Sequence, residues 1–167
     1  MSIIRAFWCQ PCKRYRNFQI IFTVLTLNFI LPAFSYTFSP QTAMDQFLQI
    51  NSILGGADYD IPEAASRVWR YLAAANVMTL GLCCLLLQLD LRRLYAVLIP
   101  LTFMKAYATA CWFVGWILAP QYRFFLAAAI LDLVTSCAFV WFASRAYREI
   151  KDHDLKELVP RPLEARR

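Results

Sequence analysis

The sequence is short of the residues that build most catalytic centres. It contains one histidine, His153, only four glycines, and 17% charged residues. A single histidine outside the long apolar runs excludes a haem held by two axial histidines in a membrane, and it excludes a histidine-rich metal centre. Four glycines, two of them adjacent, leave no glycine-rich phosphate-binding loop. We therefore expect no cofactor, no metal site and no catalytic residues, and the protein is more readily interpreted as a non-enzyme.

Apolar residues are abundant and clustered. The chain is 60% hydrophobic and 16% aromatic, whereas a soluble domain has about half apolar and about a quarter charged residues. Four stretches are almost free of charge, and each approaches the roughly 20 residues that cross a hydrocarbon core. They are apolar on all sides, unlike the amphipathic helices of a soluble protein. The predicted spans are residues 18–38, 69–89, 94–118 and 124–143.

Short polar turns connect the later spans. Residues 90–93 and 119–123 are each too short for anything but a tight connection between antiparallel helices. The predicted fold class is therefore an all-α integral membrane protein, an antiparallel bundle of four transmembrane helices. Its expected parts are an N-terminal arm (1–17), a transmembrane domain (18–143) and a charged C-terminal tail (144–167).

The first apolar run is interpreted as a retained span. It follows a basic region but is longer than the apolar region of a cleaved signal peptide, which has about 7–15 residues. It also ends without a small-x-small cleavage pattern.

The distribution of Lys and Arg predicts the orientation. Of the 17 basic residues, four lie in the N-terminal arm, two in the 90–93 turn and seven in the C-terminal tail, against three on the opposite side. Positively charged loops stay on the cytoplasmic side, so we expect both termini in the cytoplasm, at the cytoplasmic membrane if the host is bacterial. The net charge of +6 then reflects orientation and attraction to anionic lipid headgroups rather than nucleic-acid binding.

The one long loop, residues 39–68, is expected on the outer side. Within it, residues 41–54 place apolar side chains at helical spacing, and Gly55-Gly56 is a suitable helix stop. We predict a short outer amphipathic helix that lies on the membrane or caps the bundle.

Two charges fall inside predicted spans, Lys105 and Asp132. Charges at membrane depth are costly and usually paired or functional. Because their spans form a hairpin, we predict that the two side chains meet in the interior. The favoured interpretation is a structural ion pair, and the alternative is an ion relay or a counter-charge for a polar ligand. Residues that would extend a polar network around them are Asn28, Asn76, Tyr107, Thr109, Thr135 and Ser136.

Cysteine provides one local motif. The residues Trp8-Cys9-Gln10-Pro11-Cys12-Lys13 resemble the active-site pattern of thioredoxins. That resemblance implies a redox pair at Cys9 and Cys12, but the thioredoxin motif follows a strand and opens a helix, and this chain has no room for the strand. We interpret Cys9 and Cys12 first as unspecialised thiols, second as a redox pair and last as half of a zinc site.

These observations favour a small multi-pass membrane protein that acts as a non-catalytic accessory or scaffolding subunit of a larger membrane complex. Its expected partners are the lipid bilayer and other membrane subunits. The first alternative is a small transporter or ligand-binding bundle that uses Lys105 and Asp132. The second is a membrane thiol-disulfide oxidoreductase that uses Cys9 and Cys12.

Overall fold

The protein is described by a computed structural model that covers residues 12–58 and 63–151, with side chains except at 40, 43 and 63–68. Four helices in these ranges are long and apolar enough to cross a membrane, which confirms the four predicted apolar helices. The elements are α2 (Lys13–Phe38), α3 (Pro40–Ile53), α4 (Glu63–Leu89), α5 (Leu91–Leu94), the 3₁₀ turn η1 (Tyr95–Val97), α6 (Leu98–Leu118) and α7 (Phe124–Ile150).

Local sequence explains where the helices begin and end. Ser39 precedes a proline, which disfavours the helical conformation at that residue, and α3 then begins with Pro40 at its first position. At the other end of α3, Gly55 has φ +70°, a conformation that favours glycine. Asp90 caps α5, because its side chain accepts a hydrogen bond from the Arg93 backbone N–H at 3.1 Å.

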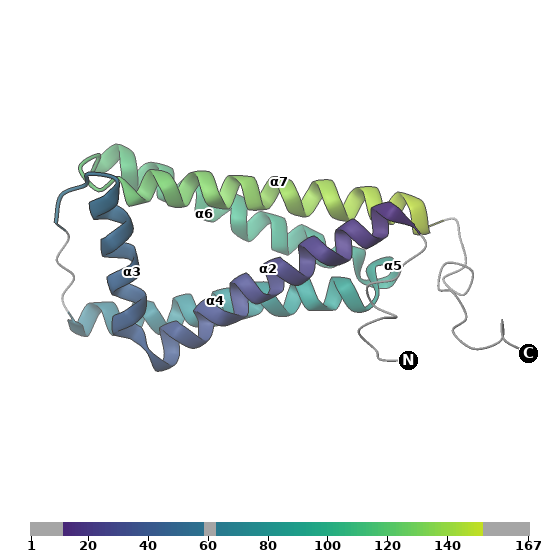
Figure 1. The fold of residues 1–167 in the computed structure, drawn as a ribbon, viewed down its shortest axis with the longest axis horizontal. Helices are drawn as coiled ribbons and strands as arrows, with labels where there is room; N and C mark the ends of the chain where they lie inside the picture. Colours follow the sequence, from purple (N-terminus) through teal and green to yellow (C-terminus); the bar gives the residue numbers. More distant parts are fainter. Residues whose placement is uncertain (1–11, 59–62, 152–167) are drawn as a thin grey trace, which may run out of the picture.

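The long helices pack as two pairs. Helix α2 lies along α4, and α6 lies along α7 (Figure 1). Gly81 permits the close approach of α4 to α2, since a Cβ there would lie 2.8 Å from Ile30 Cγ1. Helix α7 runs seven residues beyond the predicted span, to Ile150.

The two pairs meet at one end of the molecule, which we call the α5 end. Here α2 crosses onto α7, and the start of α2 reaches the end of α7 through an ion pair between Arg14 and Glu149. Phe22 and Phe139 are fully buried, with ring centroids 5.7 Å apart. Most of the buried core gathers around them, with Phe18, Phe29, Cys84, Leu87, Leu101 and Ala143.

At the opposite end, which we call the α3 end, α3 is the helix that links the two pairs in the part of the chain that the structure describes (Figure 1). The C-terminus of α3 is attached to the α6–α7 turn by hydrogen bonds. Arg123 Nη1 donates to the Leu54 carbonyl at 2.8 Å, and Asn51 Nδ2 holds the segment after α3 by donating to the Ala57 carbonyl at 2.6 Å. The Ala57 backbone N–H donates to the Gln121 carbonyl at 2.9 Å. Helix α3 thus spans the distance between two pairs that have separated.

Candidate functional site

The structure joins Lys105 on α6 to Asp132 on α7 in an ion pair. The side chains are 13% and 10% exposed, so both charges are largely withdrawn from the surroundings. Helices α6 and α7 lie side by side, and the flexible Lys105 stem reaches Asp132. The contact explains how two charges are accommodated within helices apolar enough to cross a membrane.

Trp112 supplies a second hydrogen bond to the Asp132 carboxylate. Its Nε1–H donates to Oδ2 at 3.1 Å, while Oδ1 receives the ammonium group of Lys105. Lys105 and Trp112 are seven residues apart on α6 and therefore share a face. Helical spacing also places Thr109 on this face, but the hydrogen bond from Trp112 was not anticipated from the sequence.

Lys105 retains hydrogen-bonding capacity. An ammonium group has three donors. One meets Asp132, and no second acceptor for the ammonium group lies among the residues that the structure describes. The Nζ atom also lies 5.0 Å from the centroid of the Phe29 ring, a cation–π contact that satisfies no hydrogen bond.

A chain of contacts between aromatic rings leads from this ion pair through α6, α7 and α3 back to α2. Trp112 contacts Phe124 with centroids 6.4 Å apart, Phe124 contacts Phe47 at 6.4 Å, and Phe47 stacks on Tyr36 at 6.3 Å. Tyr36 and Phe29 both belong to α2, which closes the chain of contacts. We call these residues the perimeter: Phe29, Tyr36, Phe47, Lys105, Trp112, Phe124 and Asp132.

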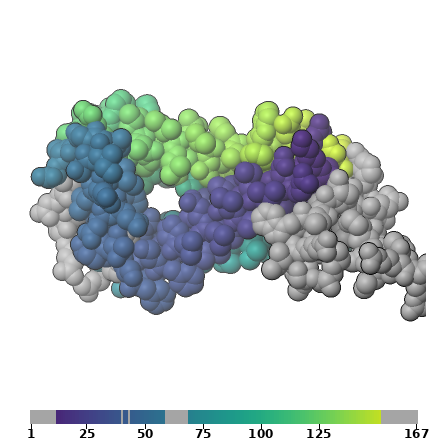
Figure 2. Space-filling model, viewed as in Figure 1, coloured from purple at the N-terminus to yellow at the C-terminus, as the bar shows by residue number. Residues whose placement is uncertain are grey.

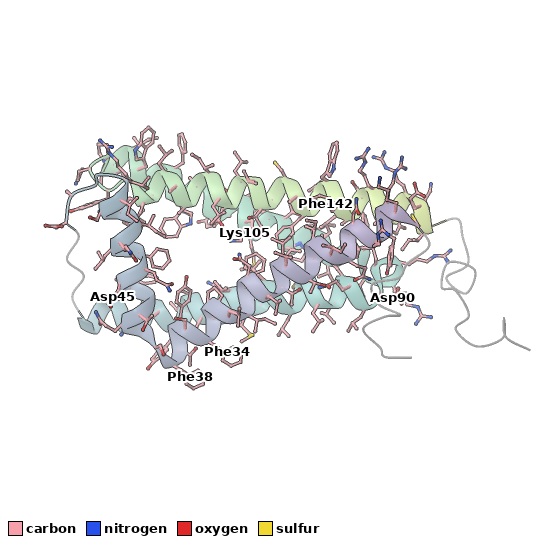
Figure 3. The ribbon with its side chains drawn as sticks, viewed as in Figure 1. Phe34, Phe38, Asp45, Asp90, Lys105 and Phe142 are labelled. Carbon is pink, nitrogen blue, oxygen red and sulfur yellow. The ribbon has the colours of Figure 1, made fainter. Side chains whose placement is uncertain are left out.

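The perimeter draws on α2, α3, α6 and α7, and three of these helices border an opening. Figure 2 shows an opening between α3, α2 and α7 in the space-filling view, through which the background is visible. Figure 3 places Lys105 in the space between α2 and the α6–α7 pair. A charged pair with an unused donor thus borders an opening between the two helical pairs.

The wider polar network forms only in part. Thr109 and Thr135 donate to backbone carbonyls of their own helices, at 2.9 and 2.8 Å, and Ser136 is buried beside Asp132 on α7. Asn28, Asn76 and Tyr107 are exposed instead. No hydrogen bond joins any of the three to the ion pair among the described residues, so an extension of the network through them stays a prediction.

The structure separates Cys12 from this site. Cys12 lies at the α5 end, where its Sγ donates to Glu149 Oε2 at 3.4 Å. Cys9 lies outside the described residues. Cys83, Cys84, Cys111 and Cys137 are free thiols on α4, α6 and α7. Within 12–58 and 63–151, no three side chains of the metal-binding types are grouped to hold an ion.

A second buried polar group was missed from the sequence. Gln88 on α4 donates to the Thr26 hydroxyl and accepts from the Thr23 hydroxyl, both at 2.7 Å. Gln19 donates to the Gln88 carbonyl at 3.0 Å. The spacing of residues 19, 23 and 26 on one face of α2 was the available signal. We call these hydrogen bonds among Gln19, Thr23, Thr26 and Gln88 the Gln88 ladder. The ladder joins α2 to α4 within one helical pair, so it contributes to stability and does not border the opening.

Comparison of the chain with models of known families, with curated proteins and with solved structures finds no match in any of the three.

Proposed function

We propose that the protein is a four-span integral membrane protein of antiparallel topology, with its α5 end in the cytoplasm. Two observations support this placement. Among the described residues, Lys and Arg are concentrated at the α5 end, at 13–16, 92–93 and 145–151, as the positive-inside rule requires. The start of α2 and the end of α7 also lie together, joined by Arg14 and Glu149. In this orientation α3 is the outer amphipathic helix that covers the bundle.

Within that topology, we propose that the protein binds or transports a small ligand through Lys105 and Asp132. The observation that carries the proposal is the unused hydrogen-bonding capacity of Lys105 beside the opening in Figure 2. A purely structural pair in a membrane is best served by complete burial among helices. Here the pair instead lies beside the opening, and ring contacts connect Trp112 with Phe124, Phe47 and Tyr36; aromatic residues are usual in a small-molecule site.

The test is the identity of small molecules that accompany the protein during purification. The wild type and a double variant, Lys105→Met with Asp132→Leu, are extracted in mild detergent, and bound molecules are measured by mass spectrometry. We expect a stoichiometric molecule with the wild type and its loss from a folded double variant. A matched control is Thr79→Val, because Thr79 is exposed on α4 and bonds only its own helix. Equal recovery from all three proteins contradicts a site at Lys105 and Asp132.

A second candidate, an accessory subunit of a larger membrane complex, is favoured by two exposed amides. Asn28 on α2 and Asn76 on α4 lie within the candidate spans, and neither side chain has a hydrogen-bond partner among the described residues. Amides at membrane depth commonly bond a neighbouring helix. Co-purification with wild type and with Asn28→Leu/Asn76→Leu tests this role. A stoichiometric partner that the variant loses supports it, and a partner-free wild type contradicts it.

A further inference from the structure

We propose that the ligand is a neutral, bilayer-soluble amphiphile whose head carries a carbonyl group on a flat ring, and that it reaches the site sideways from the lipid. This inference rests on the proposed ligand-binding function and specifies the class of molecule. It follows from three features of the perimeter: its charge balance, its unused donor and its aromatic walls.

The charge balance favours a neutral head. Lys105 and Asp132 neutralise one another, and no other charged side chain belongs to the perimeter. An anionic or cationic head would leave one uncompensated charge in a site with little water, which is expensive in a low-dielectric environment. A neutral molecule leaves the pair intact.

The unused donor requires an acceptor. Both oxygens of Asp132 already receive a donor, from Lys105 and from Trp112. The ammonium group of Lys105 still has donors that no described residue accepts. A carbonyl oxygen fits this position, since it accepts a charge-assisted hydrogen bond without adding a charge. A hydrocarbon without an acceptor would leave the donor unsatisfied.

The walls favour a flat head. Five of the seven perimeter residues are aromatic, and they come from four different helices. Aromatic faces stack on a planar ring at centroid distances of about 4.5–7 Å. The contacts of Phe47 with Tyr36 and Phe124 are themselves near the long end of that range, at 6.3 and 6.4 Å, so these rings are only loosely packed on one another.

The position of the opening indicates the route. It lies between α2 and α7, along the sides of helices long enough to cross the membrane, while α3 covers the end of the molecule (Figures 1 and 2). A molecule dissolved in the bilayer therefore reaches Lys105 between the helical pairs without leaving the hydrocarbon.

Photolabelling with para-decylbenzophenone tests this inference. The probe is a neutral aryl ketone that dissolves in lipid and inserts into nearby C–H bonds on illumination. The full chain is reconstituted in phosphatidylcholine vesicles, labelled, digested and mapped by mass spectrometry. Three unlabelled competitors share a ring and tail: para-decylacetophenone carries a neutral carbonyl, decylbenzene has none, and para-decylbenzoate is an anion.

We expect the label on residues 29–36 and 105–112 to be displaced by the acetophenone, and roughly tenfold less effectively by decylbenzene, as the loss of one charge-assisted hydrogen bond predicts. Lys105→Met should weaken displacement by the acetophenone to the level of decylbenzene. Tyr107→Phe is the matched control, because Tyr107 lies on the same helix with its side chain 64% exposed. The wild-type competition stands by itself should the Lys105 variant fail to fold.

The contrary outcomes separate the two proposals. Displacement by the benzoate but not by the acetophenone overturns the neutral class and leaves a ligand site at Lys105. Equal displacement by decylbenzene and the acetophenone overturns the carbonyl requirement. Uniform labelling of all lipid-facing helices, with no competitor protecting residues 29–36 or 105–112, contradicts both this inference and the proposed function.

Discussion

The two ends of the molecule are built from the same helices but are packed in different ways. At the α5 end, fully buried Phe22 and Phe139 meet between α2 and α7, and the Gln88 ladder lies alongside. At the α3 end, the same helices separate around an opening, and among the described elements α3 links them. The comparison indicates that stability is concentrated at the α5 end, which leaves the α3 end free to hold a site that close packing would fill.

The largest loss of stability is expected when one of the two charges of the ion pair is removed. Asp132→Leu leaves Lys105 buried without its counter-charge, and loss of one partner of a buried pair costs about 3–5 kcal/mol. The double variant with Lys105→Met should recover most of that loss. The free energy of unfolding in mixed SDS and detergent micelles measures both. If the double variant is as unstable as the single one, the pair is not the source of the effect.

The next prediction contrasts the two ends directly. Phe22→Ala removes a side chain with no exposed surface, and we expect a loss of about 3–5 kcal/mol, as for other buried phenylalanines. Phe47→Ala, in the half-buried wall of the opening, should cost less than about 1 kcal/mol, because the ring has fewer neighbours to lose. Both are read from the same SDS unfolding titration. Equal losses would mean that the α3 end is packed as tightly as the α5 end.

Sequence periodicity predicted the components of the site but not its setting. The four apolar helices follow from the charge-free runs, and the meeting of Lys105 with Asp132 follows from the hairpin that their spans form. The opening could not be predicted, because it depends on the angle between the two helical pairs. The turn at Ser39, from which α3 leaves α2 toward the other pair, also leaves no periodic signal.

The same limit explains the missed ladder. Gln19 and Gln88 lie near the ends of their spans, where polar residues are ordinary in any membrane helix. Only the packing of α2 on α4 shows that both are buried, at 2% and 4% exposed. Burial of a polar side chain is a tertiary property, and hydropathy along one helix does not report it.

A third prediction tests the ladder itself. Gln88→Leu removes hydrogen bonds to the hydroxyls of Thr23 and Thr26, but each threonine keeps a bond to a backbone carbonyl of α2. We therefore expect a loss of only about 1–2 kcal/mol, as for hydrogen bonds between membrane helices. Thr79→Val, an exposed polar-to-apolar change on the same helix, is the control. A loss as large as that of Phe22→Ala would show that the ladder, rather than the aromatic core, holds the α5 end together.

The smallest loss of global stability is expected from a change at the C-terminus of α3, where hydrogen bonds attach it to the α6–α7 turn. A Cβ at Gly56 would collide with the side-chain amide of Asn51, which donates to the Ala57 carbonyl at 2.6 Å and accepts from the Phe124 backbone N–H at 3.4 Å. Gly56→Ala must displace that amide, and we expect a loss of about 1 kcal/mol for the hydrogen bonds broken. Gly115→Ala is the control, since its Cβ would lie 3.6 Å or more from Phe125, an ordinary contact.

The distinguishing measurement for Gly56→Ala is local rather than global. Because α3 lies at the end where the helical pairs have separated, its release should speed hydrogen exchange at residues 51–57 while the amides of α2 and α4 near Gln88 keep their protection. Gly115→Ala should change neither set. If exchange instead rises together at both ends of the molecule, α3 and the α5-end core unfold as one cooperative unit, and the proposed division between a stabilising end and an open end does not hold.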